Sequence, residues 1–148
     1  MGLIADLGQG PVAIDSVAFI YFIEEHPRFL PLVEELFAAV DGGRLAAVTS
    51  SLTLLEVMVV PYRAGDLALA ERYEALLTRG RGLRLVELDR GQLRAAAQLR
   101  AVFPSLRTPD ALQLAAARAA GCSALVTNDR RIPALPGLRV LELSSYLR

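Results

Sequence analysis

Five short runs of mainly apolar residues along the chain are typical of buried strands. Each run is three to six residues long and is bounded by polar or turn-forming residues. Because strands that are apolar throughout are buried on both faces, they favour a parallel sheet with helices on both sides. The five runs are Val12–Ile14, Leu45–Thr49, Leu83–Leu88, Ala124–Thr127 and Leu138–Leu143.

The segments between these runs carry apolar residues at intervals of three and four, which predicts helices. In one of them, Thr108 is the expected N-cap, Pro109 the first helical residue and Gly121 the stop. Alternating strands and helices predict one α/β domain over residues 1–148, with a central parallel sheet. The other helices are expected over residues 29–40, from Ser50 or Ser51 to before Pro61, over 66–79, and from Asp89 onward.

Four acidic residues occur where the predicted strands end or the following helices begin. Asp15 follows the first run directly, and Asp129 follows the fourth. Glu56 lies in the helix after the second run, and Asp110 lies in the first turn of the helix that begins at Thr108–Pro109. Parallel sheets bind ligands at the carboxyl ends of their strands. We therefore expect the four carboxyl groups to converge on one site.

Each acid also has a purely structural interpretation when it is taken alone. Asp15 can cap the next helix, Asp110 can interact with a helix dipole, and Asp129 can form a turn with its neighbours. Glu56 can face solvent from its helix, although it is surrounded by apolar residues. The four acids together are more specific than any one of them.

A divalent cation would relieve the repulsion among four carboxylates. Like charges and burial both raise carboxyl pKa values, and the chain has no lysine to offset them. Oxygen ligands suit Mg²⁺ or Mn²⁺, which can activate water and hold a phosphate. Asp15, Glu56, Asp110 and Asp129 are thus predicted as metal ligands and catalytic residues. A lone His26 and a lone Cys122 exclude a Cys/His zinc cluster and a disulfide framework.

The chain contains the four blocks AIDSVAFIYFIEEHP, SSLTLLEVMVVP, LRTPDALQLAAA and GCSALVTNDRRI, in this order. These blocks resemble the signature blocks of PIN domains, most closely those of VapC-type toxins. The resemblance covers residues 13–143 and implies a three-layer α/β/α fold and a metal-dependent endoribonuclease whose four acids are those above. It also implies supporting polar groups at Ser16 and Thr127, and we expect the same of Asn128. Gln113 and Ile132 depart from the family pattern without affecting the acids.

Charge and hydropathy suggest the partners. Residues 1–60 carry a net charge of −6 and residues 61–148 a net charge of +6, and every basic residue is arginine. Arg107, Arg130 and Arg131 are the expected contacts to an RNA backbone. The longest stretch without a charge, residues 45–55, is too short to span a membrane, yet 53% of residues are hydrophobic. We therefore expect a cytoplasmic homodimer whose apolar surface is also covered by a partner protein, and the resemblance implies that this partner is an antitoxin.

Two other functions compete with RNA cleavage. A phosphatase that used Asp15 as nucleophile would need a second aspartate two positions on and a lysine, but position 17 is Val17 and the chain has no lysine. A non-catalytic PIN-like module that binds RNA or protein is the stronger alternative. The intact set of four acids favours the nuclease. Whether it is a toxin or a housekeeping nuclease depends on an antitoxin encoded nearby.

Overall fold

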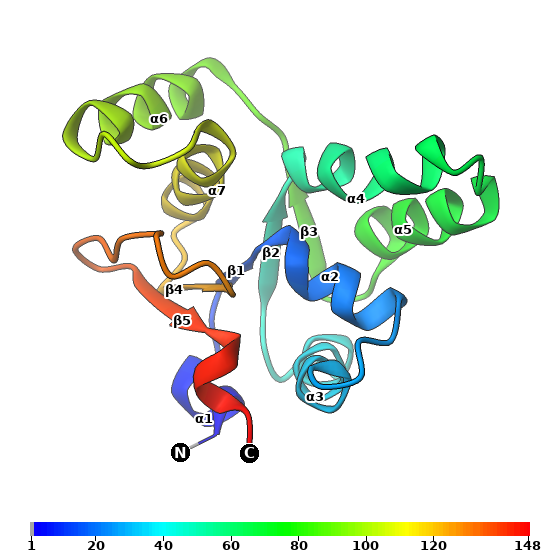
Figure 1. The fold of residues 1–148 in the computed structure, drawn as a ribbon. Helices are drawn as coiled ribbons and strands as arrows, with labels where there is room; N and C mark the ends of the chain where they lie inside the picture. The colour runs from blue at the N-terminus through cyan, green and yellow to red at the C-terminus, as the bar shows by residue number, and fades with distance from the viewer. Residues whose placement is uncertain (1) are drawn as a thin grey trace.

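Five parallel strands form the central sheet of the computed structural model, which describes residues 2–148. The strand order is β3-β2-β1-β4-β5 (Figure 1). In the register of the two central pairs, Ala13 of β1 lies opposite Val48 of β2 and Leu125 of β4. The predicted parallel sheet is confirmed. The strands are β1 (Val12–Ile14), β2 (Ala47–Ser50), β3 (Leu83–Val86), β4 (Ala124–Thr127) and β5 (Arg139–Glu142).

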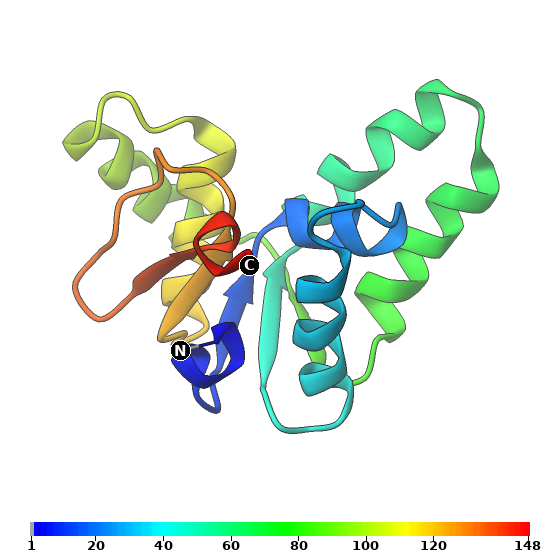
Figure 2. The same cartoon turned by 60° about the horizontal axis from the view of Figure 1, so that its bottom comes forward.

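Side chains alternate between the two faces of the sheet, and each face has its own hydrophobic core. Val12 and Ile14 of β1 belong to one core, whereas Ala13 between them belongs to the other. The helices segregate accordingly, so the three-layer fold is confirmed (Figures 1 and 2). The first core contains residues of α1 (Leu3–Leu7), α2 (Ser16–Ile23), α3 (Leu30–Asp41), α4 (Leu52–Arg63) and α5 (Leu67–Arg79), and the second those of α6 (Arg90–Val102) and α7 (Thr108–Ala119).

Two predicted helix boundaries were wrong. The helix expected to stop before Pro61 continues through it, and α4 ends at Arg63. A proline inside a helix removes one backbone hydrogen bond, but the Pro61 ring is buried, which offsets part of that cost. In α7 the N-cap is Arg107 and not Thr108, so Pro109 is the second helical residue. The one-residue shift makes Arg107 the N-cap residue, three positions before Asp110.

Four smaller differences concern elements that the apolar pattern predicts poorly. The third strand stops at Val86 rather than Leu88, and the fifth spans only Arg139–Glu142. A short helix, α1, precedes the first strand, and a 3₁₀ helix follows the last one at Leu143–Tyr146. Such one-turn helices are too short to develop an amphipathic repeat.

The strand order places a topological switch point between β1 and β4. The chain runs outward from β1 to β2 and β3 and then returns to the other side of β1 as β4. Parallel sheets open a crevice where the order reverses, at the carboxyl ends of the two strands. The α4–α5 and α6–α7 helix pairs lie toward these ends on opposite sides (Figure 1).

Candidate functional site

Asp15 lies directly after β1, on one side of the switch point. Its backbone N–H donates to the carbonyl oxygen of Val126 in β4 at 2.9 Å. One carboxyl oxygen accepts from the N–H of Ser16 at 2.8 Å, and the other accepts from the hydroxyl of Thr127 at 2.7 Å. Burial raises the pKa of Asp15, and these hydrogen bonds offset only part of the rise. Asp15 therefore caps α2 and also presents a buried carboxyl group that has no cationic partner among residues 2–148.

Glu56 lies in the second turn of α4 and faces the same region. Burial raises the pKa of its carboxyl group, and the charges of Asp15 and Asp110 raise it further. The side-chain amide of Gln113 in α7 donates to Glu56 Oε1 at 3.2 Å and acts in the opposite direction. Glu56 thus points toward two of the other three acids, and neutral groups are its donors.

A buried chain of hydrogen bonds supports Glu56 from below, and sequence reasoning missed it. Gln113 Nε2 also donates to Thr53 Oγ1 at 2.9 Å, and Thr53 and Thr49 share a hydrogen bond of 2.7 Å. Because the only hydroxyl hydrogen of Thr49 goes to the Ile14 carbonyl at 2.7 Å, Thr53 must be the donor to Thr49. This series of hydrogen bonds orients the side-chain amide of Gln113 so that its N–H group donates to Glu56. The signal in the sequence was the presence of single polar residues, Thr49, Thr53 and Gln113, within otherwise apolar stretches.

Asp110 and Asp129 have arginine partners instead. Arg107 Nε donates to Asp110 Oδ2 at 3.1 Å, and Arg107 Nη2 donates to Asp129 Oδ2 at 3.2 Å. Arg131 donates to Asp129 through its backbone N–H at 2.9 Å, through Nε at 3.1 Å and through Nη2 at 3.0 Å. Hydrogen bonding by the Arg131 side chain lowers the pKa of Asp129. The turn predicted at Asp129 and the first-turn position predicted for Asp110 are both present.

The four predicted acids lie in one region but not in one coordination shell. Asp15, Glu56 and Asp110 act on one another electrostatically, and Arg107 connects Asp110 to Asp129. Among residues 2–148, no three His, Cys, Asp or Glu side chains are close enough to hold a metal ion as they stand. The shared metal site therefore stays a prediction. The donor set itself fits a hard divalent cation, because it is entirely oxygen and, within residues 2–148, neither the buried Asp15 nor the half-buried Glu56 has a cationic hydrogen-bond partner.

The three predicted supporting residues have different roles. Thr127 bonds Asp15 through its hydroxyl, and the same oxygen accepts from the N–H of Asp129 at 3.2 Å. Ser16 contacts the Asp15 carboxyl through its N–H and, at 3.4 Å, its hydroxyl. Asn128 turns away: its amide donates to the Tyr21 hydroxyl at 3.0 Å and accepts from the N–H of Ser144. Asn128 thus fixes the loop after β4 and does not contact the acids directly within the described chain.

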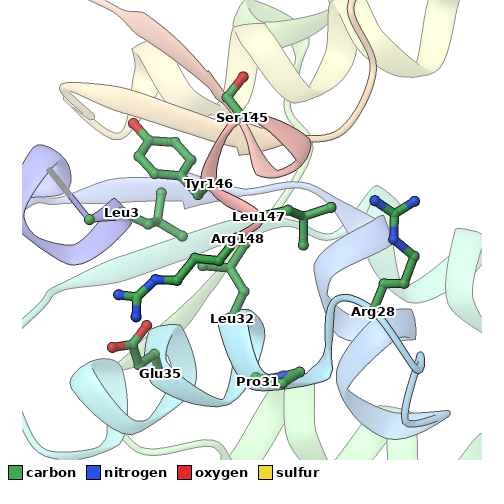
Figure 3. Close-up of a pocket in the computed structure, with 10 residues that line it drawn as sticks. Leu3, Arg28, Pro31, Leu32, Glu35, Ser145, Tyr146, Leu147 and Arg148 are labelled. Atoms are coloured by element: carbon green, nitrogen blue, oxygen red, sulfur yellow. The ribbon is translucent and has the colours of Figure 1, made fainter.

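A pocket elsewhere on the molecule contains none of the predicted site residues. It has a volume of about 790 Å³ and lies between α1, α3 and the 3₁₀ helix (Figure 3). Leu3, Leu32 and Leu147 line it together with Arg28 and Arg148. The acids lie at the carboxyl ends of β1 and β4 and in α4 and α7. The pocket is therefore separate from the candidate site.

Apolar side chains remain exposed on several helices. Leu55, Val60 and Tyr62 of α4 are 62%, 62% and 55% exposed, and Leu67 at the start of α5 is 62% exposed. No helix within residues 2–148 has the length and apolar character needed to cross a bilayer. The apolar content noted in the sequence is therefore partly a surface property.

Comparisons with known proteins agree on the fold. A toxin–antitoxin complex from Klebsiella pneumoniae is 20% identical with a TM-score of 0.64, over 86% of this chain and 94% of the other. VapBC2 from Rickettsia felis, bound to a promoter DNA fragment, is 18% identical with a TM-score of 0.68, over 88% and 97%. VapC20 from Mycobacterium tuberculosis, a toxin that cleaves the Sarcin-Ricin loop, is 15% identical with a TM-score of 0.62, over 77% and 86%.

The sequence comparisons set the family. No curated protein sequence matches the chain. The PIN domain family model matches residues 12–138, which include β1 through to the loop before β5 and all four acids. With this match and the three-layer fold, the chain belongs to the PIN domain family.

Proposed function

We propose that this PIN domain is a divalent-metal-dependent endoribonuclease and the toxin of a toxin–antitoxin pair. The observation that carries the proposal is the convergence of Asp15, Glu56 and Asp110 at the switch point of the sheet. Burial and mutual repulsion raise the pKa values of Asp15 and Glu56, and a scaffold without a cation site gains nothing from that arrangement.

The residues around the acids would divide the work of binding and orientation. Asp15, Glu56 and Asp110 would hold Mg²⁺ or Mn²⁺, with Asp129 beside them. When bound, such an ion neutralises phosphate charge and lowers the pKa of a bound water. Thr127 keeps the Asp15 carboxyl in one orientation, and Gln113 does the same for Glu56. Arg107, Arg130 and Arg131 would contact phosphates at the rim.

Single-stranded or loop RNA is the substrate that fits this site. The acids are recessed, since Asp15 and Asp110 are buried, and a flexible backbone can bend into such a position where a stiff helix cannot. VapC20, one of the similar structures, is a toxin that cleaves the Sarcin-Ricin loop, which supports a loop as the substrate. Water is the expected nucleophile, and the expected product ends are a 5′-phosphate and a 3′-hydroxyl.

A protein partner is supported by the similar structures and by the surface. Both the Klebsiella pneumoniae and the Rickettsia felis structures are toxin–antitoxin assemblies. The exposed apolar residues of α4, namely Leu55, Val60 and Tyr62, offer area for an antitoxin or a second copy of the chain. Light scattering of the isolated chain should give the mass of a homodimer at micromolar concentration. A monomer would contradict self-association but not antitoxin binding.

A cleavage assay with single-stranded RNA tests the activity. We expect cleavage with Mg²⁺ or Mn²⁺ and none with EDTA. Asp15→Asn should lower the rate by roughly 10²–10³-fold or more, because it removes a preorganised charge without changing shape. A melting curve should show that the variant is folded. Cleavage that persists in EDTA, or a 2′,3′-cyclic phosphate product, would contradict the metal-water mechanism. Binding of RNA without cleavage under any condition would support the non-catalytic module.

A further inference from the structure

Arg107 occupies an unusual position at the rim of the acid site. It is the N-cap of α7, three residues before Asp110, and its guanidinium bridges Asp110 and Asp129 from two different elements. Its side chain is 55% exposed, whereas that of Asp110 is 8% exposed. Within residues 2–148, Arg107 is the only hydrogen-bond donor to the Asp110 carboxyl group. A solvent-exposed cation therefore covers a recessed carboxylate.

We propose that Arg107 is a resident counter-cation that a divalent ion displaces from Asp110 and Asp129, and that the released guanidinium then binds a phosphate of the RNA. This inference rests on the proposed function and adds a coupling between ion binding and RNA binding. A guanidinium carries only donors, and it occupies one oxygen of each carboxylate, Asp110 Oδ2 and Asp129 Oδ2, that an ion would need as a ligand. Arginine and ion therefore compete for the same atoms.

The contacts of Arg107 suit exchange better than those of Arg131. Arg107 makes one hydrogen bond to each carboxylate, at 3.1 Å and 3.2 Å, from a side chain that is more than half exposed. Ion pairs of this kind stabilise weakly, so an ion of higher charge density can replace them. Arg131 is held to Asp129 through its backbone N–H as well as its side chain. Asp129 thus keeps a partner when Arg107 leaves, and Asp110 becomes free.

Exchange would make the ion and the RNA bind cooperatively. With the ion absent, Arg107 is occupied by carboxylates and is a poor phosphate ligand. With the ion bound, the same guanidinium lies unpaired at the rim, where planar arginine binds phosphate well. By linkage, RNA that takes up Arg107 must raise the affinity for the ion by the same factor.

Calorimetric titration of Mn²⁺ into the RNA-free protein tests the competition. Arg107→Gln should bind Mn²⁺ about 3–10-fold more tightly than the wild type, the order expected for losing a weak exposed ion-pair competitor. Arg107→Lys should fall between the two, because one ammonium cannot reproduce a fork that spans two carboxylates. Arg118→Gln is the matched control. It removes the same charge from the last turn of α7, away from Asp110, so this variant should bind Mn²⁺ with the wild-type affinity.

Fluorescence anisotropy of a labelled 2′-O-methyl RNA oligonucleotide, checked for integrity on a gel, tests the coupling. Mn²⁺ should strengthen RNA binding to the wild type and to Arg118→Gln, and much less to Arg107→Gln. Melting curves show whether each variant is folded. If Arg107→Gln does not fold, the same measurements are made with Arg107→Lys. Wild-type Mn²⁺ binding with equal or weaker binding by the Arg107 variants would overturn the exchange and leave the proposed function standing. Absence of Mn²⁺ binding by all proteins would overturn both.

Discussion

The four acids form two pairs that differ in the kind of hydrogen-bond donor their carboxyl groups have. Asp15 and Glu56, the neutral-donor pair, accept hydrogen bonds from Thr127, the Ser16 N–H and Gln113, none of which is charged. Asp110 and Asp129, the arginine pair, are bonded to arginine guanidinium groups. The pKa values of the first pair are raised, mainly by burial, whereas that of Asp129 is lowered, mainly by its hydrogen bond to Arg131.

The difference indicates where ion binding would gain its free energy. In the neutral-donor pair each negative charge is costly, since hydroxyl and amide dipoles only partly replace water. A cation there relieves an existing repulsion. In the arginine pair the charges are already compensated, so an ion must first displace Arg107. The neutral-donor pair should therefore dominate affinity, and the arginine pair should tune it.

The largest effect expected in a stability measurement is the response to Mg²⁺ or Mn²⁺. An ion at about 100 times its dissociation constant should stabilise the fold by about 2.7 kcal/mol, which corresponds to a melting-temperature rise of about 5–10 °C. Asp15→Asn should lose most of this rise and Asp110→Asn should weaken it. Differential scanning fluorimetry with an EDTA control measures the shift. Equal shifts in the wild type and both variants would place the ion elsewhere.

Gln113→Leu should separate the two pairs by affecting only the neutral-donor pair. It removes the amide that bonds Glu56 and Thr53, so about 1–3 kcal/mol of stability should be lost from polar groups left without a partner. Gln92→Leu is the matched control, because Gln92 is also buried but donates to the backbone carbonyl of Glu87. Chemical denaturation should show a loss in both variants. Only Gln113→Leu should change the Mn²⁺ response, and an equal change in both would exclude a role for Gln113 in positioning Glu56.

The pH dependence of stability, measured in EDTA, should have opposite signs for the two pairs. The raised pKa of Asp15 means that its stabilising contribution is present below the unfolded value of 3.8 and is lost as pH rises through the folded pKa. The lowered pKa of Asp129 contributes stability above 3.8 that is lost as pH falls through the folded pKa. At pH 7, Asp15→Asn should therefore be as stable as the wild type or more so. Asp129→Asn should be less stable, by about 0.2–1 kcal/mol, because its partners are exposed. The same sign for both variants would contradict the comparison.

The convergence of the acids could be predicted from the sequence because topology determines it. Once Val12–Ile14 and Ala124–Thr127 are recognised as parallel strands, the residues that follow them must lie at the same edge of the sheet. Asp15 and Asp129 occupy those positions without any knowledge of side-chain conformation. The sheet and its layers followed from the same pattern.

The partners of the acids could not be predicted, because they depend on long side chains and on one-residue boundaries. Arg107 and Arg131 were predicted as RNA contacts, and this stays a prediction; their ion pairs with the acids were not predicted. The contact of Arg107 depends on its place as N-cap of α7, which sequence reasoning assigned to Thr108. Gln113 was recorded only as a departure from the family pattern, since nothing in a linear sequence places its amide beside Glu56.

The smallest predicted effect concerns Arg130, which lies outside both pairs. Its side chain is 82% exposed and pairs with Glu142, so it is free to exchange that partner for a phosphate at little cost. In an Asp15→Asn background, where RNA stays uncut, Arg130→Ala should weaken RNA binding about 2–5-fold. It should also reduce the slope of log affinity against log salt by about 0.7, the value for one phosphate contact on a single strand. Arg118→Ala, at the end of α7 away from Asp110, is the control and should leave the slope unchanged. If the two variants had equal slopes of log affinity against log salt, Arg130 would not contact an RNA phosphate. Arg107 would then remain as the arginine that connects the acids to the substrate.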